Sequence, residues 1–453
     1  MLPLIPYPTT MNLSGGTCRF NPDTLVFQEQ STLPHEGYHL SITPTQTVLA
    51  FADDAGRFYG EQTLQQLTSP DGTVPLGEIE DAPRFSWRGF MIDSSRHIQT
   101  VDEIKAFIAA AARYKLNVFH WHLCDDQGWR FESERYPRLN EIGAFRNGWG
   151  FGNPNPERYG GLFTKAQIRD IIAFCAARHI TVVPEIDMPG HSAAVLKSYP
   201  HLSCIGDAAD VPTGAGVFSS VLCAGKEETF EFCCGILEEV MDLFPGKYIH
   251  IGGDEVPKDN WDACPLCQKR IADEGLKDSE DLQGYFTARI CAFLREHGKT
   301  PIGWNEVLNA GICPQDMVAT KWWDRENRCD AFANSGGKII MEETAHVYLD
   351  YDYHRTPLRQ TYSYDLQPDT LTAAGKQNVL GIEAPIWTEW VETFSRMGYM
   401  CFPRLLAVAE LGWCGKAPTD YPAFRQRAEA QRAALDALGV TMAPAEDWDP
   451  EDT

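Results

Sequence analysis

The sequence predicts an α/β fold, namely a (β/α)8 TIM barrel preceded by a small α+β N-terminal domain. The first observation is that, from residue 87 onward, short apolar segments of strand type alternate with helical stretches. The second is their number, because eight such segments fit a closed parallel barrel better than an open sheet. The third is length, since 453 residues accommodate a barrel of about 250 residues together with a smaller domain.

The small N-terminal domain is expected over residues 1–82. Alternating apolar residues indicate three strands, and an amphipathic pattern indicates one helix. The expected strands are 23–28, 37–42 and 47–52, and the expected helix is 56–67. Residues 70–75 contain two prolines and a glycine, which predict a turn-rich break, and the domain ends at residues 81–83. No segment of this domain carries a recognisable catalytic set of side chains.

The catalytic barrel is expected over residues 83–420, and a C-terminal helical tail packed on it over residues 421–453. Two barrel helices have recognisable starts, because Thr100 and Thr164 each stand three residues before a glutamate or glutamine, as in a capping box. The eight expected barrel strands are 88–93, 117–123, 181–186, 248–251, 301–304, 317–322, 338–341 and 379–383.

Charge and hydropathy exclude several classes of partner. The chain has 39 basic and 63 acidic residues, a net charge of −24 that repels nucleic acid and anionic membranes. No apolar run reaches the ~20 residues needed to span a bilayer. The N-terminus has three prolines and no basic segment ahead of an apolar one, which argues against a signal peptide and predicts a cytoplasmic location. A neutral or cationic small substrate is expected, and the oligomeric state is left open.

The fourteen cysteines leave two interpretations open. Cys264 and Cys267 have the spacing of a metal-ligand or redox pair, but no second such pair or histidine pair follows at the distance typical of zinc fingers. Cys233 and Cys234 fall inside a helical pattern. Reduced thiols without a metal are therefore expected, with structural zinc as the alternative.

The segment that organises the predicted site is residues 247–257, KYIHIGGDEVP. A short apolar strand runs through two glycines into Asp254 and Glu255. Neighbouring side chains of a strand point to opposite faces, but the glycines supply the backbone freedom to turn both carboxylates toward one cavity. Two acids held together beside apolar surface should differ in proton affinity, which suits acid catalysis near neutral pH.

The other strand ends carry aromatic and acidic side chains with a single arginine, at the edge where the active sites of such barrels lie. From the first strand to the eighth, the candidates are Asp93 and Arg96; His120, His122, Asp125 and Asp126; Glu185, Asp187 and His191; Asp254 and Glu255; Trp304 and Glu306; Trp322 and Trp323; Tyr348 and Asp350; and Trp387 and Glu389. Indole faces stack on the C–H face of a pyranose, and carboxylates accept hydrogen bonds from its hydroxyls. The ring of residues therefore indicates a sugar-binding pocket.

From about residue 36 to residue 413 the chain resembles glycoside hydrolase family 20, the β-N-acetylhexosaminidases. The motifs that carry the resemblance are PRFSWRGFMIDSSRH, NVFHWHLCDDQGWR, VVPEIDMPGH, HIGGDE, GWNE, YLDY and WTEW, in this order along the chain. The segments EGYHLSI and GRFYGEQTLQQL also resemble the small domain that precedes the barrel in this family.

The resemblance implies a retaining, substrate-assisted mechanism, without a cofactor or metal. The 2-acetamido oxygen of the sugar attacks the anomeric carbon and forms an oxazolinium intermediate. Glu255 would be the general acid and then the base for the incoming water, and Asp254 would hold and polarise the acetamide N–H. The substrate would be a glycan with a terminal β-linked N-acetylhexosamine, GlcNAc or GalNAc.

The binding residues follow from the same resemblance. Arg96 would bind the C3 and C4 hydroxyls, with Glu389 opposite at C4 and C6; Tyr348 would donate to the acetamide carbonyl and Asp350 would bind the C4 or C6 side. The tryptophans expected to wall the sugar are Trp304, Trp387 and one of Trp322 or Trp323, of which an ungapped comparison favours Trp322.

Asp125 and His191 would form a relay that tunes the protonation of Glu255. Five further residues would be structural or would support the site from behind: Asp187 and His250, which are the candidates for support, and His120, Asp126 and Trp129. The family often has one more tryptophan after the YLD motif, near the leaving group. Here Tyr362 and Tyr364 stand in that region, which leaves the leaving-group preference open.

Three other functions remain as alternatives. A disaccharide-releasing, lacto-N-biosidase-like enzyme or one specific for sulfated GlcNAc would share the same motifs. A metal-dependent barrel hydrolase could use His120 and His122, which lie on one strand face, and retained activity in EDTA would exclude it. A non-catalytic carbohydrate-binding protein would explain the aromatic residues but not the acid pair.

Overall fold

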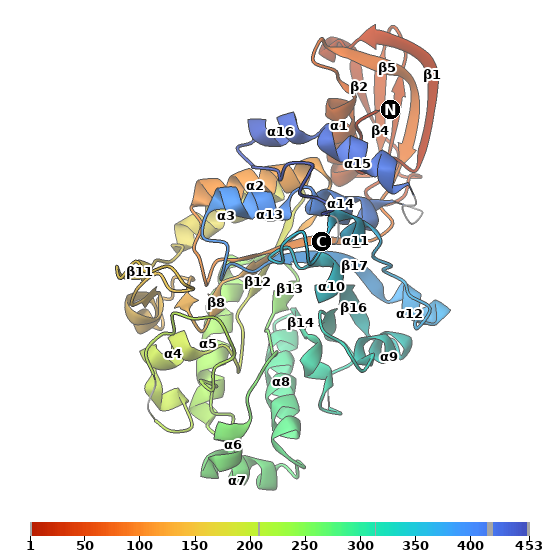
Figure 1. Cartoon of the computed structure of the whole chain (residues 1–453). Helices are drawn as coiled ribbons and strands as arrows, with labels where there is room; N and C mark the ends of the chain where they lie inside the picture. The colour runs from red at the N-terminus through yellow and green to blue at the C-terminus, as the bar shows by residue number, and fades with distance from the viewer. Residues whose placement is uncertain (1, 207–208, 313, 415–419, 451–453) are drawn as a thin grey trace.

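The computed structural model describes residues 2–206, 209–312, 314–414 and 420–450. A twisted five-stranded sheet with one helix lies at one end of the molecule, and a closed barrel of eight parallel strands forms its body (Figure 1). The predicted fold class is confirmed. Among the described residues, none of the helices combines the length and apolar character needed to cross a bilayer.

The N-terminal sheet has the strand order β1-β5-β3-β4-β2. Its strands are β1 (Thr10–Arg19), β2 (Leu25–Glu29), β3 (Tyr38–Ile42), β4 (Thr47–Phe51) and β5 (Thr73–Asp81), with helix α1 (Asp54–Leu67) against β3 and β4. The three predicted strands and the predicted helix are confirmed.

Two strands of this sheet were missed, and the turn-rich break expected at residues 70–75 is shorter than predicted because β5 begins at Thr73. Strand β1 lies at the sheet edge and is exposed or half-buried along its whole length, so it lacks the alternation that reveals a strand. Strand β5 contains Pro75, which is tolerated because this part of β5 pairs with β1 alone.

All eight predicted barrel strands are present, with ends shifted by at most a few residues. They are β6 (Trp87–Asp93), β7 (Val118–His122), β12 (Thr181–Glu185), β13 (Tyr248–His250), β14 (Thr300–Trp304), β15 (Val318–Lys321), β16 (Lys338–Met341) and β17 (Val379–Ile386). Strand β17 pairs in parallel with β6, which closes the barrel. Two small hairpins follow β7: β8 (Cys124–Asp125) with β9 (Gly128–Trp129), and β10 (Phe145–Arg146) with β11 (Tyr159–Gly160).

Long helices surround the barrel, and shorter helices lie within its connecting loops. They are α2 (Val101–Arg113), α3 (Lys165–Ala176), α4 (Ala193–Ser198), α5 (Glu227–Leu243), α6 (Asp259–Ala263), α7 (Pro265–Asp273), α8 (Ser279–Glu296), α9 (Arg328–Asn334), α10 (Thr344–Val347), α11 (Leu358–Tyr362), α12 (Ala373–Gln377), α13 (Phe394–Cys401), α14 (Arg404–Trp413), α15 (Tyr421–Glu429) and α16 (Arg432–Ala437). Both predicted capping boxes are formed, at the starts of α2 and α3.

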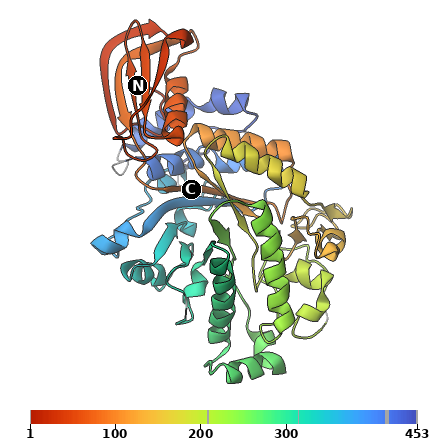
Figure 2. The ribbon, with the colours of Figure 1, turned by 180° about the vertical axis from the view of Figure 1, so that it is seen from behind.

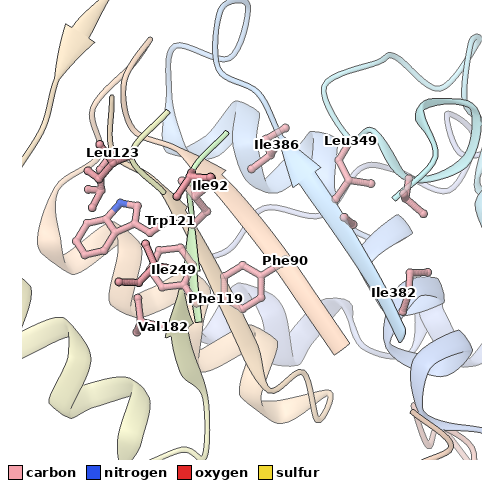
Figure 3. Packing of buried hydrophobic residues seen from close by; sticks show 14 of the residues in the cluster. Phe90, Ile92, Phe119, Trp121, Leu123, Val182, Ile249, Leu349, Ile382 and Ile386 are labelled. Atoms are coloured by element: carbon pink, nitrogen blue, oxygen red, sulfur yellow. The ribbon is translucent and has the colours of Figure 1, made fainter. Parts of the chain in front are cut away.

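Side chains of the barrel strands alternate between two environments. Phe119 and Trp121 of β7 point outward with Phe90 of β6 and pack in the layer between strands and helices (Figure 3). Val118, on the opposite face of β7, belongs to a separate apolar cluster that includes Trp87 and Val183. This inner cluster fills the barrel at the amino-terminal ends of its strands. Polar residues follow later on this inward face of the strands, and they lie nearer the carboxyl-terminal opening of the barrel.

Buried ion pairs join the N-terminal sheet to the barrel. Arg88 Nη1 lies 2.9 Å from Glu36 Oε2, and Lys115 Nζ lies 3.1 Å from Asp81 Oδ2, with both cationic side chains almost fully buried. Trp413 also donates from Nε1 to Asp81 at 2.9 Å. Helices α15 and α16 lie beside helix α1 of the N-terminal domain (Figures 1 and 2).

Candidate active site

The inward faces of the barrel strands carry polar side chains above the apolar layer. On β7, Val118 is followed at every second position by His120 and His122. Glu185 of β12 stands among these histidines: its Oε2 lies 3.1 Å from His120 Nε2 and contacts His122 Nδ1. Although burial alone would raise the pKa of Glu185, the neighbouring histidines hold it well below its ordinary value. A buried charged layer therefore forms the floor of the site.

The same layer fixes two residues from the neighbouring strands. His250 Nδ1 of β13 lies 2.9 Å from Glu185 Oε1, and Trp304 of β14 donates from Nε1 to that carboxylate at 2.8 Å. Trp304 is only 1% exposed and does not line the cavity above. Its indole packs behind Trp322 and Trp387, with ring centroids 6.4 and 5.8 Å away. In this structure Trp304, the last residue of β14, thus stands behind the rings that line the cavity, and its contact with the sugar stays a prediction.

The glycines after β13 turn the acid pair toward the cavity. Gly252 and Gly253 have φ angles of 65° and 97°, which favour glycine. A Cβ atom on Gly252 would lie 1.8 Å from Asp187 Oδ1, and this same carboxylate oxygen accepts the backbone N–H of Gly253 at 3.1 Å. Asp254 and Glu255 then line the same cavity, of about 440 Å³.

His191 stands between two pairs of carboxylates. Its Nδ1 lies 3.2 Å from Asp125 Oδ1 and 3.1 Å from Asp126 Oδ2, and its Nε2 lies 3.6 Å from Asp254 Oδ2 and 3.7 Å from Glu255 Oε2. Asp126, expected to be structural or to support the site, shares His191 with Asp125, and it also accepts the backbone N–H of Ala193 at 2.9 Å at the start of α4.

The proton affinity of Glu255 suits a proton donor. Burial and the negative charge of Asp254 raise the pKa of Glu255, while His191 opposes the shift. Two adjacent carboxyl groups in one cavity consequently differ in environment: Asp254 is the more buried, and Glu255 is the more exposed to the opening. This is the arrangement in which one acid stays protonated beside a neighbour.

Arg96 is the buried cation of the cavity. Its Nη2 lies 2.7 Å from Asp125 Oδ2 and 3.7 Å from Glu389 Oε1, and its Nη1 lies 3.2 Å from Asp93 Oδ2. The guanidinium carbon stands 5.1 Å from the ring centroid of Trp387. The guanidinium is therefore held in one orientation by carboxylates and an aromatic face, with a donor edge toward the cavity.

Aromatic side chains form the cavity wall. Trp322, Tyr348 and Trp387 all line it, and the rings of Trp322 and Tyr348 are stacked with an interplanar angle of 20°. Trp322 donates from Nε1 to Glu306 Oε2 at 2.8 Å, which fixes the indole. Trp323 is 42% exposed and lines only an adjoining cavity of about 450 Å³. Of the two tryptophans left open by the sequence, the structure places Trp322 in the pocket.

Three polar atoms of the cavity are buried without a partner in the described part of the chain: Asp254 Oδ1, Asp350 Oδ1 and Trp387 Nε1. Burial, followed by the charge of Glu389, raises the pKa of Asp350 to about 7. Buried polar groups without partners are rare, and two acceptors and one donor facing the same space indicate a polar ligand that supplies the missing hydrogen bonds.

Family models match both parts of the chain. The model described as the catalytic domain of glycosyl hydrolase family 20 matches residues 85–416, and the model of domain 2 of the same family matches residues 22–82. The chain belongs to glycosyl hydrolase family 20. It is a glycoside hydrolase, as the family resemblance implied.

Relatives of known name support the family assignment. A β-hexosaminidase of Porphyromonas gingivalis is 42% identical over 449 residues, which cover 94% of this chain but 56% of that protein. The chain thus spans little more than half the length of this relative. Among solved structures, the β-N-acetylhexosaminidase of Bacteroides fragilis is 33% identical with a TM-score of 0.87 over 98% of each chain. The exo β-N-acetylglucosaminidase of Vibrio harveyi, in complex with N-acetylglucosamine, is 30% identical with a TM-score of 0.88, covering 98% of this chain and 78% of that one.

The rim of this family 20 site contains residues that the sequence analysis did not assign. Tyr351 and Arg355 line the cavity, with the guanidinium 3.5 Å from the ring centroid, and Trp390 stands at the opening with 67% of its surface exposed. Tyr351 and Trp390 end the motifs VYLDY and WTEW, so the motifs contained a signal for them. Arg355 lies in an irregular loop without a recognisable pattern.

The two tyrosines considered for the leaving-group side lie elsewhere. Tyr362 donates its hydroxyl to Glu410 at 2.9 Å, and Tyr364 stacks on His346 with ring centroids 4.5 Å apart. Both are buried in the core outside the cavity. Neither tyrosine therefore takes the place of a tryptophan beside the cavity, because Tyr362 packs on Phe424 of α15 and Tyr364 packs on His346 of α10.

The two histidines that a metal-dependent hydrolase would use as ligands contact carboxylates of the protein. His120 Nδ1 lies 2.7 Å from Glu383 and its Nε2 lies 3.1 Å from Glu185, while His122 contacts Glu185 and Asp125. His120, Glu185 and His250 have donor atoms close enough to hold a cation. They lie in the charged floor of the barrel, however, and none of the three lines the cavity.

Proposed function

We propose that this chain is an exo-acting, retaining β-N-acetylhexosaminidase. It would remove terminal β-linked GlcNAc, or GalNAc, from oligosaccharides or glycoconjugates. The observation that carries the proposal is the pair Asp254 and Glu255 turned by two glycines into one aromatic-walled cavity, with Asp254 Oδ1 unpartnered. The names of the relatives, and the N-acetylglucosamine bound in the Vibrio harveyi structure, support this choice of substrate.

The acid pair suits a reaction in which the substrate supplies the nucleophile. The acetamide oxygen forms the bond to the anomeric carbon while Glu255 gives its proton to the departing glycosidic oxygen. Asp254 Oδ1 accepts the acetamide N–H, which increases the electron density on the acetamide oxygen and stabilises the positive charge of the oxazolinium ring. Water then attacks the anomeric carbon, Glu255 takes its proton, and the acetamide is restored with retention of configuration.

Contacts at the closed end of the cavity would select the terminal position of a glycan. Arg96, Asp350 and Glu389 supply donors and acceptors for hydroxyls on one side of the sugar, and Asp350 Oδ1 is free to accept. Because these groups are buried, an analogue that lacks a partner hydroxyl leaves them unsatisfied and binds poorly. Trp322, Tyr348 and Trp387 would enclose the acetamide methyl group.

His191 would serve as the positioning residue for the acid pair. Its two nitrogens link Asp125 and Asp126 to Asp254 and Glu255. Burial alone would lower the pKa of His191, but the charges of Asp125 and Asp254 raise it well above its ordinary value. The imidazole therefore holds both carboxylates from one side, and its charge opposes the rise that burial and Asp254 cause in the pKa of Glu255.

A rate comparison on para-nitrophenyl β-glycosides tests the proposal. We expect fast release from the GlcNAc derivative and slow release from the glucose derivative, which lacks the acetamide. The rate on the GalNAc derivative shows whether the enzyme accepts the other configuration at C4. The product released from the N,N′-diacetylchitobiose derivative shows whether the enzyme removes a monosaccharide or a disaccharide. Equal rates on GlcNAc and glucose derivatives would refute substrate assistance, and a thiazoline analogue of the intermediate should inhibit tightly.

A further inference from the structure

Four cysteines from separate segments converge outside the active site. Cys204 follows a short 3-10 turn after α4, Cys223 precedes α5, and Cys264 and Cys267 flank the start of α7. Their sulfurs all lie within 4.8 Å of one another. The Sγ atom of Cys267 is 3.6 Å from that of Cys223 and 3.8 Å from that of Cys204, and Cys223 is 3.9 Å from Cys264.

These distances match a tetrahedron of thiolates. With zinc–sulfur bonds of about 2.3 Å, tetrahedral geometry places the sulfurs about 3.8 Å apart. A disulfide requires about 2.05 Å, so the observed spacings are too long for disulfides, and the four thiols are free. Three of the cysteines are buried and Cys204 is half-buried. Four sulfur ligands leave no position open for substrate or water, which is typical of structural rather than catalytic zinc sites.

The backbone segments that carry the four cysteines pack directly against one another. A Cβ atom on Gly225 would lie 2.4 Å from the carbonyl carbon of Leu266 and 2.5 Å from the nitrogen of Cys267, so only glycine allows these two segments to meet. Ser203 and Leu222 form an antiparallel bridge between the segments of Cys204 and Cys223. The cluster is thus held by backbone contacts that are independent of the sulfurs.

A cation stands beside the cluster as well. Lys226 Nζ donates to the carbonyl of Ser203 at 2.8 Å and to that of His201 at 2.5 Å, next to Cys204. A zinc ion with four thiolates carries a net charge of −2, which a neighbouring ammonium group stabilises. The surrounding charge therefore suits a filled tetrathiolate site.

We propose that Cys204, Cys223, Cys264 and Cys267 bind one Zn²⁺ ion as a closed structural site. Binding displaces the four thiol protons and forms four zinc–sulfur bonds, with no change of oxidation state. The proposal departs from the expectation of reduced, metal-free thiols. The sequence concealed the site because only Cys264 and Cys267 have a recognisable spacing, and the other two ligands lie far upstream.

The site would join the two loops that carry the acid pair and its histidine. Leu222, next to Cys223, donates its backbone N–H to the carbonyl of Pro189 at 2.9 Å, two residues before His191. Trp261, close to Cys264, donates from Nε1 to the carbonyl of Leu222 at 2.9 Å. Helices α6 and α7 lie at the end of the molecule farthest from the N-terminal sheet (Figures 1 and 2). Zinc there would tie together loops that otherwise project from the barrel.

Metal analysis of the full chain tests the proposal without using activity. The wild-type protein, purified without chelator or a metal-affinity step, should contain about one equivalent of zinc per chain. Cys267→Ser and Cys223→Ser should each lose most of it, whereas Cys175→Ser, at a buried thiol of α3 outside the cluster, should retain it. Wild-type protein free of zinc, iron in its place, or equal zinc in all variants would overturn the proposal.

Cobalt substitution provides a second measurement that does not depend on whether the serine variants fold. Wild-type protein released from its metal by a mercurial and refilled with Co²⁺ should show the thiolate charge-transfer and visible bands of a tetrahedral tetrathiolate site. The release should lower the Tm, and added Zn²⁺ should restore it. An octahedral spectrum would overturn the assignment, and so would an intact mass reduced by the thiol hydrogens, which would reveal disulfides.

Discussion

His191 Nε2 lies 3.7 Å from Glu255 Oε2, and both residues hold their backbones in the left-handed region, with φ angles of 45° and 47°. Two non-glycine residues in this conformation cost on the order of 1–3 kcal/mol each. The cost is sustained because each is held by its neighbours: Gly190 packs against the carbonyl of Asp254, and the turn before Glu255 rests on Asp187. Backbone strain at two residues that face each other across one cavity is consistent with a functional pair.

Replacing Glu255 with glutamine should remove the proton donor and leave the fold intact. The expected loss in kcat is about 10²- to 10⁴-fold, the usual contribution of a general acid or base. The measurement is turnover of the para-nitrophenyl GlcNAc derivative, with circular dichroism as the control for folding. Activity close to wild type would show that Glu255 is not the acid.

Trp322→Ala and Trp323→Ala form a matched pair of neighbouring substitutions. Trp322 lines the cavity, so its loss should lower kcat/KM by about 10- to 100-fold, corresponding to the burial of an aromatic side chain against the sugar. Trp323 faces the adjoining cavity and should change hydrolysis of a simple GlcNAc glycoside by about 2-fold or less. A larger loss for Trp323 than for Trp322 would reverse the assignment.

Gly252→Ala should abolish activity, and Gly275→Ala should not. The two glycines have nearly the same φ angle, 65° and 67°, but nothing lies within 4 Å of a Cβ atom on Gly275. Both substitutions carry the left-handed cost of about 1–2 kcal/mol, which is measured by urea unfolding. Only Gly252→Ala also collides with Asp187, so its additional loss of kcat reports displacement of the acid pair. Equal behaviour of the two variants would contradict this account.

Glu306 links pH to stability. Burial, followed by the charge of Asp254, raises the pKa of Glu306 from 4.5 to about 8. Between these values the unfolded chain loses the proton and the folded chain keeps it, so stability falls as pH rises. In Glu306→Gln the amide oxygen can still accept the hydrogen bond of Trp322 Nε1, but the side chain no longer titrates, so this loss of stability with rising pH disappears. Relative to wild type, the variant should gain about 2 kcal/mol between pH ~5 and pH ~7 in urea unfolding.

The control for that prediction is Glu326→Gln, at an exposed position of the loop after β15. It should show no comparable gain over the same pH range. If Glu306→Gln and the control behaved alike, Glu306 would be ionised in the folded protein, and the buried neutral carboxyl beside the acid pair would be refuted.

The parts of the site that the sequence predicted are those encoded in a single segment. The turn of Asp254 and Glu255 into one cavity depends on Gly252 and Gly253, which precede them directly, and the barrel strands carry their own apolar pattern. The role of Trp304 could not be read in this way. Whether a side chain at a strand end lines the cavity or supports its wall depends on where the strand stops, which is decided by pairing with neighbours.

Features built from distant segments escaped prediction for the same reason. Arg355 reaches the cavity from a loop, and Cys204 and Cys223 meet Cys267 only because loops after two different strands fold onto each other. The pairing of Asp126 with His191 could not be predicted, because His191 lies 65 positions further along the chain. Contacts of this kind are fixed by tertiary packing and leave no periodic signal in one sequence.

The salt links at the base of the barrel join the N-terminal sheet to it. A truncated polypeptide beginning at β6 would lose Glu36 and Asp81, so Arg88 and Lys115 would lose their charged partners at a surface newly opened to water. The apolar side chains that the sheet covers would be opened with them, among them Trp413, which is fully buried in the intact protein. Because exposed apolar surface of this kind favours association, shortening the hydrolase would require a redesign of this whole face.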